Sequence, residues 1–509
     1  MKKEFDVAII GLGPVGAILA GLLGKNGMNV VAIEKDKEVY PLPRAAHIDH
    51  TGLRTIQEVG CLDSVLPDMI RNKRLDLTNS HREVLARIPA DRPSVSGLPT
   101  SVYFYQPTFD AELRNAAAKF PTVEIRLGTT MTGLKQSPGN KGVEVSIQNE
   151  SAGEEVLNAK WLVGCDGGRS AIRTAVGIQL KSLNFDEKWL VLDLVVDAAK
   201  AGLPVDYVIE VCDPARPYLS TPISTGRQRF EFMLLPGEDP EKMMQREVIV
   251  SLLDAWIPES NYKIERAAVY TFHGVVAEHW RKGNIMLAGD AAHQTPPFLG
   301  QGMCAGFRDA ENLAWKLARV INGDSPERLL DTYQEERAPH ATKVIEAAIR
   351  IGKVICELDP VRAAERDKLL LANDRTLRKS LAFSLPNLER GALVLKGGGS
   401  LFVQPRVNGR YMDDIVGQRF LVLARSIAAL GSSQDWWKNE LNACVALVSQ
   451  FDCPDIHKWI NRYEAEVIVV RPDRYVLGAA KNLDLITSAV ADLLGSVKAK
   501  SLQHSMEVK

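Results

Sequence analysis

Three glycines near the amino terminus have the spacing of a phosphate-binding turn. Gly11, Gly13 and Gly16 follow an apolar run in the pattern G-x-G-x-x-G. The first glycine of this pattern permits a tight bend, the second lets the backbone approach a pyrophosphate, and the third lets a helix lie close on a sheet. A helix that begins near Pro14 would present its unpaired N–H groups to the phosphates. These residues predict a nucleotide site.

A second apolar run, Val30–Ile33, ends at Glu34. A carboxylate in this place accepts hydrogen bonds from ribose hydroxyls and would repel a 2′-phosphate. Strand, glycine turn, helix, second strand and terminal acid together make a βαβ unit that binds a dinucleotide. The fingerprint alone does not distinguish FAD from NAD.

Two further segments place acids at the ends of expected strands. Residues 161–173 run from an apolar strand into Asp166 and a Gly-Gly turn, and residues 283–303 run from another strand into Asp290. Open α/β sheets bind their ligands at the carboxyl ends of the strands. The second segment continues into a helical run from Cys304 to Val320. Both segments therefore indicate parts of a nucleotide site.

Composition and charge limit the classes of function. The chain has 509 residues, which suggests about two or three domains, and a formal net charge of −1. This balance gives no electrostatic reason to expect a nucleic acid or an anionic membrane, so we expect a small-molecule ligand. The seven cysteines and nine histidines lack metal-ligand spacing, so we expect no metal and a reducing, cytoplasmic location. The uncharged stretch 7–24 matches the nucleotide turn rather than a membrane span.

Hydrophobic periodicity predicts the elements that position these residues. Residues 182–275 contain apolar segments of period two, which indicate an antiparallel sheet with one face buried. A helical stretch near 337–357 is followed by a glycine-rich segment at 396–400, whose composition is typical of a flexible linker. Further strands and a final helix at about 482–497 complete the chain. The predicted fold class is α/β.

The three segments, in this order, resemble the fingerprints of single-component FAD-dependent aromatic hydroxylases. These are the flavoprotein monooxygenases that include para-hydroxybenzoate hydroxylase and phenol hydroxylase. The resemblance covers nearly the whole chain. Finer matches are most similar to the 3-(3-hydroxyphenyl)propionate hydroxylase branch, and they are Pro43-Arg44-Ala45 and the runs 105–110, 212–217 and 229–238.

The resemblance implies three structural parts. They are an FAD-binding Rossmann-like domain, an inserted and mainly antiparallel β-sheet substrate domain, and a carboxy-terminal thioredoxin-like domain that lacks CxxC. The implied boundaries are 1–180 for FAD binding with part of the substrate sheet near 75–107, 181–275 for the substrate sheet, 276–395 for the completion of the FAD site with a helical segment, and 396–509 for the carboxy-terminal domain.

The resemblance also assigns cofactor contacts. The residues implied to contact FAD are Gly11, Gly13, Pro14, Val15, Gly16, Glu34, Lys35, Arg44, Gln106, Asp166, Gly289, Asp290, Pro297, Gly300, Gly302 and Met303. Among them, Glu34 would bind the adenosine ribose and Asp290 the ribityl hydroxyls. Asp166 would also help to bind NADH or NADPH, which acts as a transient co-substrate. The N–H groups at Gly302 and Met303 would face the pyrimidine end of the flavin, where a helix amino terminus suits the anionic reduced ring.

The implied reaction is the hydroxylation of a phenolic ring. In these enzymes NAD(P)H reduces FAD, O2 adds at flavin C4a, and the hydroperoxide transfers oxygen to a ring that the protein positions away from water. A phenol becomes a better nucleophile as it loses its proton, so we expect a base near its hydroxyl. Asp49 is the candidate base, with His47 beside it as a proton relay. The alternative is that Asp49 caps a helix beginning at Thr51.

Substrate contacts are expected mainly from the middle sheet. The candidates are Arg216, Tyr218, Phe232 and Pro296. The resemblance suggests a carboxylated phenol such as a hydroxyphenylpropionate, although no carboxylate-binding arginine stands out. An N-heteroaromatic or polyketide-type substrate and a non-hydroxylating FAD oxidoreductase are the alternatives. The expected partners are the aromatic substrate and O2, without nucleic acid or membrane, and the resemblance leaves a homodimer open.

Overall fold

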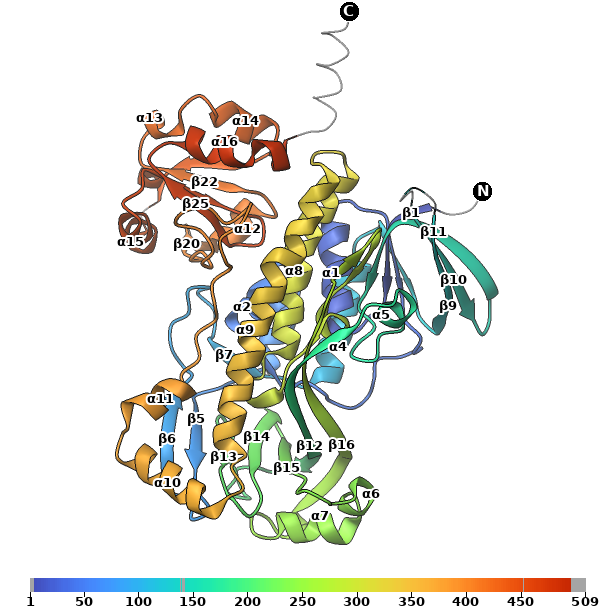
Figure 1. Ribbon diagram of the computed structural model, residues 1–509, viewed down its shortest axis with the longest axis vertical. Helices are drawn as coiled ribbons and strands as arrows, with labels where there is room; N and C mark the ends of the chain where they lie inside the picture. Colours follow the sequence, from blue (N-terminus) through green and yellow to red (C-terminus); the bar gives the residue numbers. More distant parts are fainter. Residues whose placement is uncertain (1–3, 138, 140–141, 452, 496–509) are drawn as a thin grey trace, which may run out of the picture.

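The computed structural model of the chain describes residues 4–137, 139, 142–451 and 453–495. Two eight-stranded sheets and a four-stranded sheet form its main parts. Two long helices, α8 (Gly302–Ile321) and α9 (Asp331–Ile355), run through the middle of the molecule and link these parts (Figure 1). The arrangement confirms the predicted α/β class with a Rossmann-like domain, a substrate sheet and a carboxy-terminal domain.

The first eight-stranded sheet, which we call the nucleotide sheet, has the order β17-β18-β11-β1-β2-β8, with β10 and β9 added at β11. Its strands are β1 (Glu4–Ile10), β2 (Val30–Ile33), β8 (Val123–Arg126), β9 (Thr129–Gln136), β10 (Val143–Asn149), β11 (Gly153–Gly164), β17 (Arg281–Lys282) and β18 (Ile285–Leu287). β1 pairs in parallel with β11 and with β2. The apolar residues of β1 and β2 are buried, as expected of a parallel sheet that is covered on both faces.

Helices surround this sheet and follow the signals in the sequence. α1 (Pro14–Lys25) begins with a proline at its first turn and contacts both α8 and α4 (Gln106–Ala118). The short helix α5 (Ala171–Ala175) follows β11. The strand, turn and helix predicted around the glycines are therefore present, with the helix ends at or close to their expected positions.

The second eight-stranded sheet, which we call the substrate sheet, has the order β19-β16-β12-β15-β14-β13-β5-β6. Its strands are β5 (Arg74–Thr78), β6 (Val84–Pro89), β12 (Leu180–Val196), β13 (Val208–Val211), β14 (Tyr218–Ser224), β15 (Arg227–Met233), β16 (Tyr262–Ala277) and β19 (His293–Gln294). One face, the outer face, packs apolar side chains on α6 (Pro240–Met243) and α7 (Arg246–Leu253). The opposite, inner face turns toward the nucleotide-binding part.

A small three-stranded sheet lies between the two large sheets. It consists of β3 (His47–Asp49), β7 (Ser101–Tyr103) and β4 (Ile70–Arg71), and it leads into α2 (His50–Glu58) and α3 (Leu62–Val65). In β3 and β7, His47 pairs with Tyr103 and Asp49 pairs with Ser101. This sheet therefore places the two candidate catalytic residues next to the substrate sheet.

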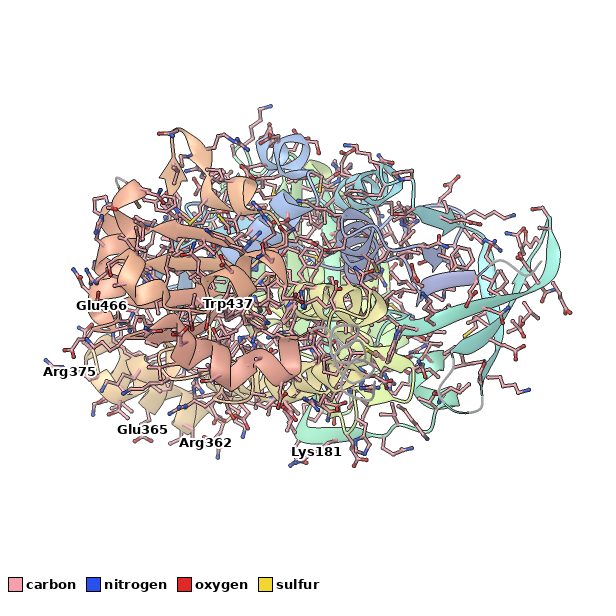
Figure 2. All side chains as sticks on the ribbon, turned by 90° about the horizontal axis from the view of Figure 1, so that it is seen from above. Lys181, Arg362, Glu365, Arg375, Trp437 and Glu466 are labelled. Atoms are coloured by element: carbon pink, nitrogen blue, oxygen red, sulfur yellow. The ribbon has the colours of Figure 1, made fainter. Side chains whose placement is uncertain are left out.

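The carboxy-terminal domain is built on the order β23-β22-β24-β25. Its elements are β20 (Arg406–Val407), β21 (Arg410–Tyr411), α12 (Met412–Val416), β22 (Leu421–Ala424), α13 (Ile427–Leu430), α14 (Gln434–Asn439), β23 (Cys444–Leu447), α15 (Pro454–Arg462), β24 (Val467–Val470), β25 (Val476–Ala480) and α16 (Leu483–Leu494). The sheet is mixed, since β22 pairs in parallel with β23 and antiparallel with β24. Figure 2 looks down on this domain, where Trp437 is fully buried among its helices and strands.

The glycine-rich segment before this domain is not a free linker. A Cβ atom added at Gly398 would lie 2.4 Å from the carbonyl oxygen of Leu477 in β25. The N–H of Gly399 donates to the Val476 carbonyl at 2.8 Å. The glycines are needed because the backbone passes so close to β25, and composition alone does not separate this use from flexibility. Upstream of this segment, α10 (Pro360–Leu371) and α11 (Arg375–Leu381) follow α9, and α10 lies beside β6 (Figure 1).

None of the helices formed by the described residues is long and apolar enough to cross a membrane. No three His, Cys, Asp or Glu side chains among them gather as a candidate metal site. The domain boundaries, the cytoplasmic location and the homodimer stay predictions.

Candidate active site

The glycine turn leaves open space where a ligand would approach it. Gly11 has a φ of +96°, and a Cβ atom there would lie 2.4 Å from the Cys165 carbonyl oxygen. A Cβ atom at Gly16 would lie 2.0 Å from the carbonyl oxygen of Gly11. At Gly13, by contrast, no atom lies within 4 Å of the added Cβ position. Two glycines are thus required by protein packing, whereas the third borders space that a pyrophosphate can fill.

The amino end of α1 is free to bind an anion. Gly13 is its N-cap and supplies no side-chain hydrogen bond, and Pro14 occupies the first turn. The unpaired N–H groups and the positive end of the helix dipole therefore face the glycine turn. Val15 has a packing role, because its side chain lies 3.0 Å from a Cβ atom added at Gly289 and 2.5 Å from one added at Gly306.

Glu34 holds the glycine turn in place. Its side chain is 8% exposed at the end of β2, and one carboxylate oxygen accepts a hydrogen bond of 2.8 Å from the Leu12 N–H. The other oxygen accepts from the N–H of Asp36 at 3.2 Å, and a guanidinium nitrogen of Arg114 lies 3.8 Å from the carboxylate. The neighbouring Lys35 is exposed. Contact between Glu34 or Lys35 and the cofactor stays a prediction.

Gln106 fixes the loop that carries Arg44. Its amide oxygen accepts from the N–H groups of Arg44 at 2.7 Å and Ala45 at 2.6 Å, and its amide nitrogen donates to Asp110 at 3.2 Å. The side chain of Arg44 is exposed. Burial raises the pKa of Asp110 to about 7, and the charge of Arg44 opposes that rise. Arg44 and Asp110 thus lie close enough to act on each other.

The substrate sheet holds the same loop from its inner face. Arg229 donates to the carbonyl oxygens of Arg44 at 2.8 Å and Pro43 at 2.9 Å, and to the carboxylate of Asp193 at 2.7 Å. Arg266 binds the carbonyl of Pro43 and lies 3.2 Å from Asp193. Sequence reasoning missed this cluster. The sequence did contain a sign of it, because each of the apolar, alternating segments includes a charged residue. A charged side chain is rarely buried in such a strand unless it is paired with an opposite charge.

Asp166 has one oxygen in use and one without a partner. Oδ2 accepts from the N–H of Ile172 at 3.0 Å, and Oδ1 is buried without a hydrogen bond in the described part of the chain. Gly167 follows with a φ of +81°. The turn after β11 therefore keeps a free acceptor at the carboxyl end of the parallel strands, where ligands bind.

Asp290 is exposed between two buried residues. Gly289 has a φ of +63°, and its N–H donates to the buried carboxylate of Asp309 at 3.1 Å. The surrounding protein raises the pKa of Asp290, and the charges of His293 and Arg44 oppose the rise. Arg44 thus lies close enough to act on Asp290 as well as on Asp110.

The segment predicted to line the flavin ring forms a tight turn. Pro297–Leu299 is a single 3-10 turn after the buried Pro296, and Gly300 follows with a φ of +60°. α8 then begins at Gly302 without a side-chain cap, and no atom lies within 4 Å of a Cβ added at Gly302. Met303 is half-buried. We call residues 296–303 the ring-end turn; it offers free N–H groups beside open space.

His47 is hydrogen-bonded to the ring-end turn. Its Nδ1 lies 3.1 Å from the carbonyl oxygen of Gly300, and its Nε2 lies 2.7 Å from the Ser101 hydroxyl. Because a carbonyl only accepts, Nδ1 carries the proton and Nε2 accepts from Ser101. Ser101 in turn accepts from the Asn72 amide at 3.1 Å. Burial lowers the pKa of His47, which favours this neutral form.

Asp49 has all its near contacts within the protein. One oxygen accepts from the N–H groups of Thr51 and Gly52, each at 2.9 Å, so Asp49 caps α2. The other oxygen is 3.0 Å from the buried guanidinium of Arg308 on α8. Burial alone would raise the pKa of Asp49, but the charges of Arg308 and His50 and the hydrogen bonds from Gly52 and Thr51 together outweigh it and hold the pKa far below its usual range. A helix cap and an ion pair account for this residue, and its role as a base stays a prediction.

The structure does not bring three of the predicted substrate residues to this site. Arg216 makes a two-point ion pair with Glu238, at 2.6 and 2.7 Å. Tyr218 and Phe232 stack at 5.4 Å on the outer face of the substrate sheet, against Trp256 and away from the loop at 44. The period of a strand gives two faces, but its register decides which face meets the pocket.

The residues present fit a dinucleotide. Among the buried polar atoms around these segments that lack hydrogen-bond partners in the described part of the chain are Asp110 Oδ1, Arg114 Nη1 and Asp166 Oδ1. Buried polar groups are normally paired, so these atoms indicate missing donors and acceptors. FAD offers ribose and ribityl hydroxyls as donors and phosphate oxygens as acceptors. The open positions at Gly13 and Gly302 leave room for its two ends.

Comparisons with known proteins agree with this site. The chain matches a family model described as FAD binding domain over residues 4–348, and a model described as HcaD C-terminal domain over residues 399–494. It is 34% identical to a probable NADH-specific resorcinol 4-hydroxylase of Rhodococcus jostii (strain RHA1), covering 97% of this chain and 96% of the relative. It is 33% identical to a 3-(3-hydroxy-phenyl)propionate/3-hydroxycinnamic acid hydroxylase of Mycobacterium avium (strain 104), covering 96% and 92%.

A solved structure shares the whole fold. Aklavinone-11 hydroxylase, crystallised with FAD and aklavinone, has a TM-score of 0.81 at 23% identity and covers 97% of this chain and 100% of its own. At that identity the likeness speaks for the fold alone, while the family match and the curated relatives extend over the motifs described above. The chain therefore belongs to the FAD binding domain family, with FAD as its cofactor, and it is a flavoprotein hydroxylase of aromatic rings, as its three motifs predict.

Proposed function

We propose that the chain uses NADH and O2 to hydroxylate a phenolic ring held between the flavin and the inner face of the substrate sheet. The observation that carries the proposal is the convergence of the glycine turn, Asp290 and the ring-end turn around space bordered by that sheet. Full-length similarity to an NADH-specific resorcinol 4-hydroxylase supports both the co-substrate and the phenolic class.

The chain's own residues would divide the work of binding. When bound, FAD would take up electrons from NADH and activate O2. The amino end of α1 beside Gly13 would bind the pyrophosphate, and Asp290 would bind ribityl hydroxyls. The uncapped amino end of α8 at Gly302 would stabilise negative charge on the reduced ring. Arg229 would keep the loop at Arg44 in place, because it binds that loop through two carbonyls.

His47 is the residue that we propose to receive the phenolic proton. Its unprotonated Nε2 accepts from the Ser101 hydroxyl, so the phenol would pass its proton to Ser101 Oγ while Ser101 passes its own proton to Nε2. Its Nδ1–H bond to Gly300 would fix the ring plane. Loss of the phenolic proton makes the ring more electron-rich, which is what electrophilic oxygen transfer needs.

Asp49 is proposed to position this site rather than to take the proton. A carboxylate that is ion-paired with Arg308 and accepts three hydrogen bonds from Thr51 and Gly52 is a poor base. We expect Asp49→Asn to lower the free energy of unfolding by about 3–5 kcal/mol, because it leaves the buried Arg308 without a counter-charge. Urea denaturation measures this change. Unchanged stability together with a slow hydroxylation step would return Asp49 to the role of base.

The activity is tested with purified protein and a panel of phenols. The protein should be yellow, phenols should stimulate NADH oxidation, and the product should carry one oxygen atom from ¹⁸O2 by mass spectrometry. NADPH in place of NADH tests the co-substrate. If flavin is bound and no phenol increases NADH oxidation or gains labelled oxygen, the hydroxylase proposal fails.

A further inference from the structure

Two glutamates lie on either side of one strand, on the inner face of the substrate sheet. Glu210 of β13 pairs with Leu219 of β14, and Leu219 pairs with Glu231 of β15. Glu231 shares its face with Arg229, two residues earlier, which binds the loop at Arg44. Glu210 is 3% exposed and Glu231 is 6% exposed. Both carboxyl groups are therefore buried on the side that faces the nucleotide-binding part.

Neither carboxyl group is satisfied by the protein. Oε2 of Glu210 and Oε2 of Glu231 are buried and lack a hydrogen bond in the described part of the chain. The nearest cation to Glu231 is Arg229 at 3.7 Å, which is longer than a hydrogen bond. An unpaired buried polar group costs about 1–3 kcal/mol, and more if it is charged. Such a pair is expected to persist only where a ligand completes it.

Electrostatics keeps the two groups from being charged together. Burial raises the pKa of Glu210 to about 8, and the charge of Glu231 adds to the rise. Burial also raises the pKa of Glu231, whereas Arg229 opposes that change. At neutral pH Glu210 is therefore mostly protonated, so its carboxyl group can both donate and accept hydrogen bonds.

Contacts connect this pair to the ring-end turn. Tyr103 lies against His47, with ring centroids 6.3 Å apart, and His47 binds Gly300. Burial raises the pKa of Tyr103, a hydrogen bond to Thr221 opposes the rise, and Glu210 adds to it. β7, which carries Tyr103, contacts β14, and Glu210 pairs with Leu219 of β14, so Glu210 lies near the residue that contacts His47. The pair faces the region where the substrate ring is proposed to lie.

A second unpartnered group lies on the same face. The indole N–H of Trp189 is buried and has no hydrogen-bond partner among the described residues. Trp189 in β12 pairs with Met233, two residues after Glu231, so it shares the face of the glutamates. Its ring meets Phe298 of the ring-end turn at 5.8 Å. One face thus has two carboxyl groups and an N–H donor without protein partners.

The terminal nitrogens of the arginines nearby are already engaged. Arg229 and Arg266 share the carboxylate of Asp193 and bind the carbonyl of Pro43, and Arg266 Nε is their one nitrogen without a partner among the described residues. Arg216 is paired with Glu238. A substrate carboxylate on this face would meet two carboxyl groups, and like charges in a buried place repel strongly. Uncharged hydroxyl groups would instead find hydrogen-bond acceptors.

We propose that Glu210 and Glu231 are the substrate-recognition pair, which binds two hydroxyl groups of an uncharged dihydroxybenzene and disfavours a carboxylated phenol. This inference rests on the proposed function, because it places the ring of that reaction against the inner face. It also replaces the carboxylated phenol suggested by the family resemblance with a neutral substrate of the resorcinol type.

Binding without turnover tests the pair. Oxidised holoenzyme, without NADH, is titrated with resorcinol, 3-methoxyphenol and 3-(3-hydroxyphenyl)propionate by calorimetry and by the change in flavin absorbance. We expect resorcinol to bind at least about tenfold more tightly than either other compound. Glu210→Gln and Glu231→Gln should each weaken resorcinol binding by about tenfold or more. Each should also reduce the difference in affinity between resorcinol and 3-(3-hydroxyphenyl)propionate.

Glu311→Gln is the matched control. Surrounding protein also raises the pKa of Glu311 to about 8, but this residue lies on α8 beside Thr55 and not on the substrate sheet. It should leave all three affinities unchanged. FAD content and the unfolding midpoint identify a glutamine variant that does not fold. In that case the affinities of the unaltered enzyme for resorcinol and 3-methoxyphenol test whether the second hydroxyl group is recognised.

Two results would overturn the inference. One is tighter binding of 3-(3-hydroxyphenyl)propionate than of resorcinol by the unaltered enzyme. The other is unchanged resorcinol affinity in both glutamine variants. These outcomes differ from failure of the proposed function, in which no phenol, charged or neutral, stimulates NADH oxidation or gains labelled oxygen.

Discussion

At the residue scale, the glycines of the first turn serve different neighbours. Alanine at Gly16 would place a methyl group 2.0 Å from the Gly11 carbonyl oxygen, whereas alanine at Gly13 would meet no protein atom within 4 Å. The φ of Gly13 is −71°, which alanine adopts without strain. We therefore expect Gly13→Ala to keep the stability of the apoprotein within about 0.5 kcal/mol but to weaken FAD binding at least about tenfold.

Gly16→Ala is the contrasting variant. It should destabilise the apoprotein itself, because helix α1 must move away from the turn. Urea denaturation of apoprotein and a fluorescence titration with FAD separate the two effects. Equal loss of apoprotein stability in both variants would contradict the assignment of open ligand space at Gly13.

The sequence could predict the roles of those residues whose function depends on neighbouring positions in the chain. The roles of Gly11 and Gly16 follow from turn chemistry that is written in neighbouring positions. The inward position of Glu231 and the outward position of Phe232 depend on strand register and on which face meets the nucleotide domain. Adjacent residues of a strand lie on opposite faces of the sheet, so a shift of one residue moves a side chain from the substrate-facing side to the core side. No short sequence motif encodes which of the two it is.

At the element scale, α8 joins the flavin site to the carboxy-terminal domain. Its amino end lies at the ring-end turn, and Lys316, near the other end, lies 3.0 Å from Glu336 of α9. Arg471 of the carboxy-terminal domain binds the same glutamate at 2.8 Å and also pairs with Asp473. All of these groups are buried. Buried ion pairs of this kind depend strongly on every member being present.

Glu336 makes this junction sensitive to acid. Burial alone would raise its pKa, but Arg471 and Lys316 outweigh burial and lower it to about 2 from an ordinary value of 4.5. A lowered pKa stabilises the fold above the ordinary value, and the stabilisation is lost as the pH falls toward the folded value. The expected loss is about 3 kcal/mol. The stability difference between the unaltered enzyme and Glu336→Gln should therefore shrink as the pH falls below about 4.5.

Urea denaturation at several pH values between about 6 and 3 measures that difference. Other carboxylates titrate in the same range, but they do so in both proteins and cancel in the comparison. A difference that stays constant over the range would show that Glu336 is not held ionised by Arg471 and Lys316.

Element boundaries were predictable where the signal is local. The sequence predicted a helix from Cys304 to Val320 and period-two strands within residues 182–275, and the structure has α8 at Gly302–Ile321 and strands such as β13 (Val208–Val211) in that range. The sequence did not indicate which strands lie next to each other in the sheets. β13 lies between β14 and β5, and β5 comes more than a hundred residues earlier in the chain, so only tertiary packing specifies that neighbour.

At the scale of the whole molecule, the carboxy-terminal domain shares its core with the flavin-binding part. Trp315 of α8 and the buried Leu329 belong to the apolar cluster that contains Phe420 and Trp437 of that domain. Arg54 of α2 donates to Asp413 of α12 at 2.5 and 2.9 Å, and Arg474 binds Glu58 of α2 at 2.6 Å. Such a shared core favours one cooperative unit over two independent domains.

We therefore expect the intact holoenzyme to unfold in a single calorimetric transition, with equal calorimetric and van't Hoff enthalpies. A chain that ends at Lys396 would expose Trp315 and leave Arg54 without Asp413, so it should aggregate or bind FAD at least about tenfold more weakly. The FAD effect follows because α8 carries both the exposed tryptophan and the ring-end N–H groups at Gly302. Two separate transitions in the intact protein, or a soluble truncated chain with full FAD affinity, would instead mean that the carboxy-terminal domain is an independent attachment.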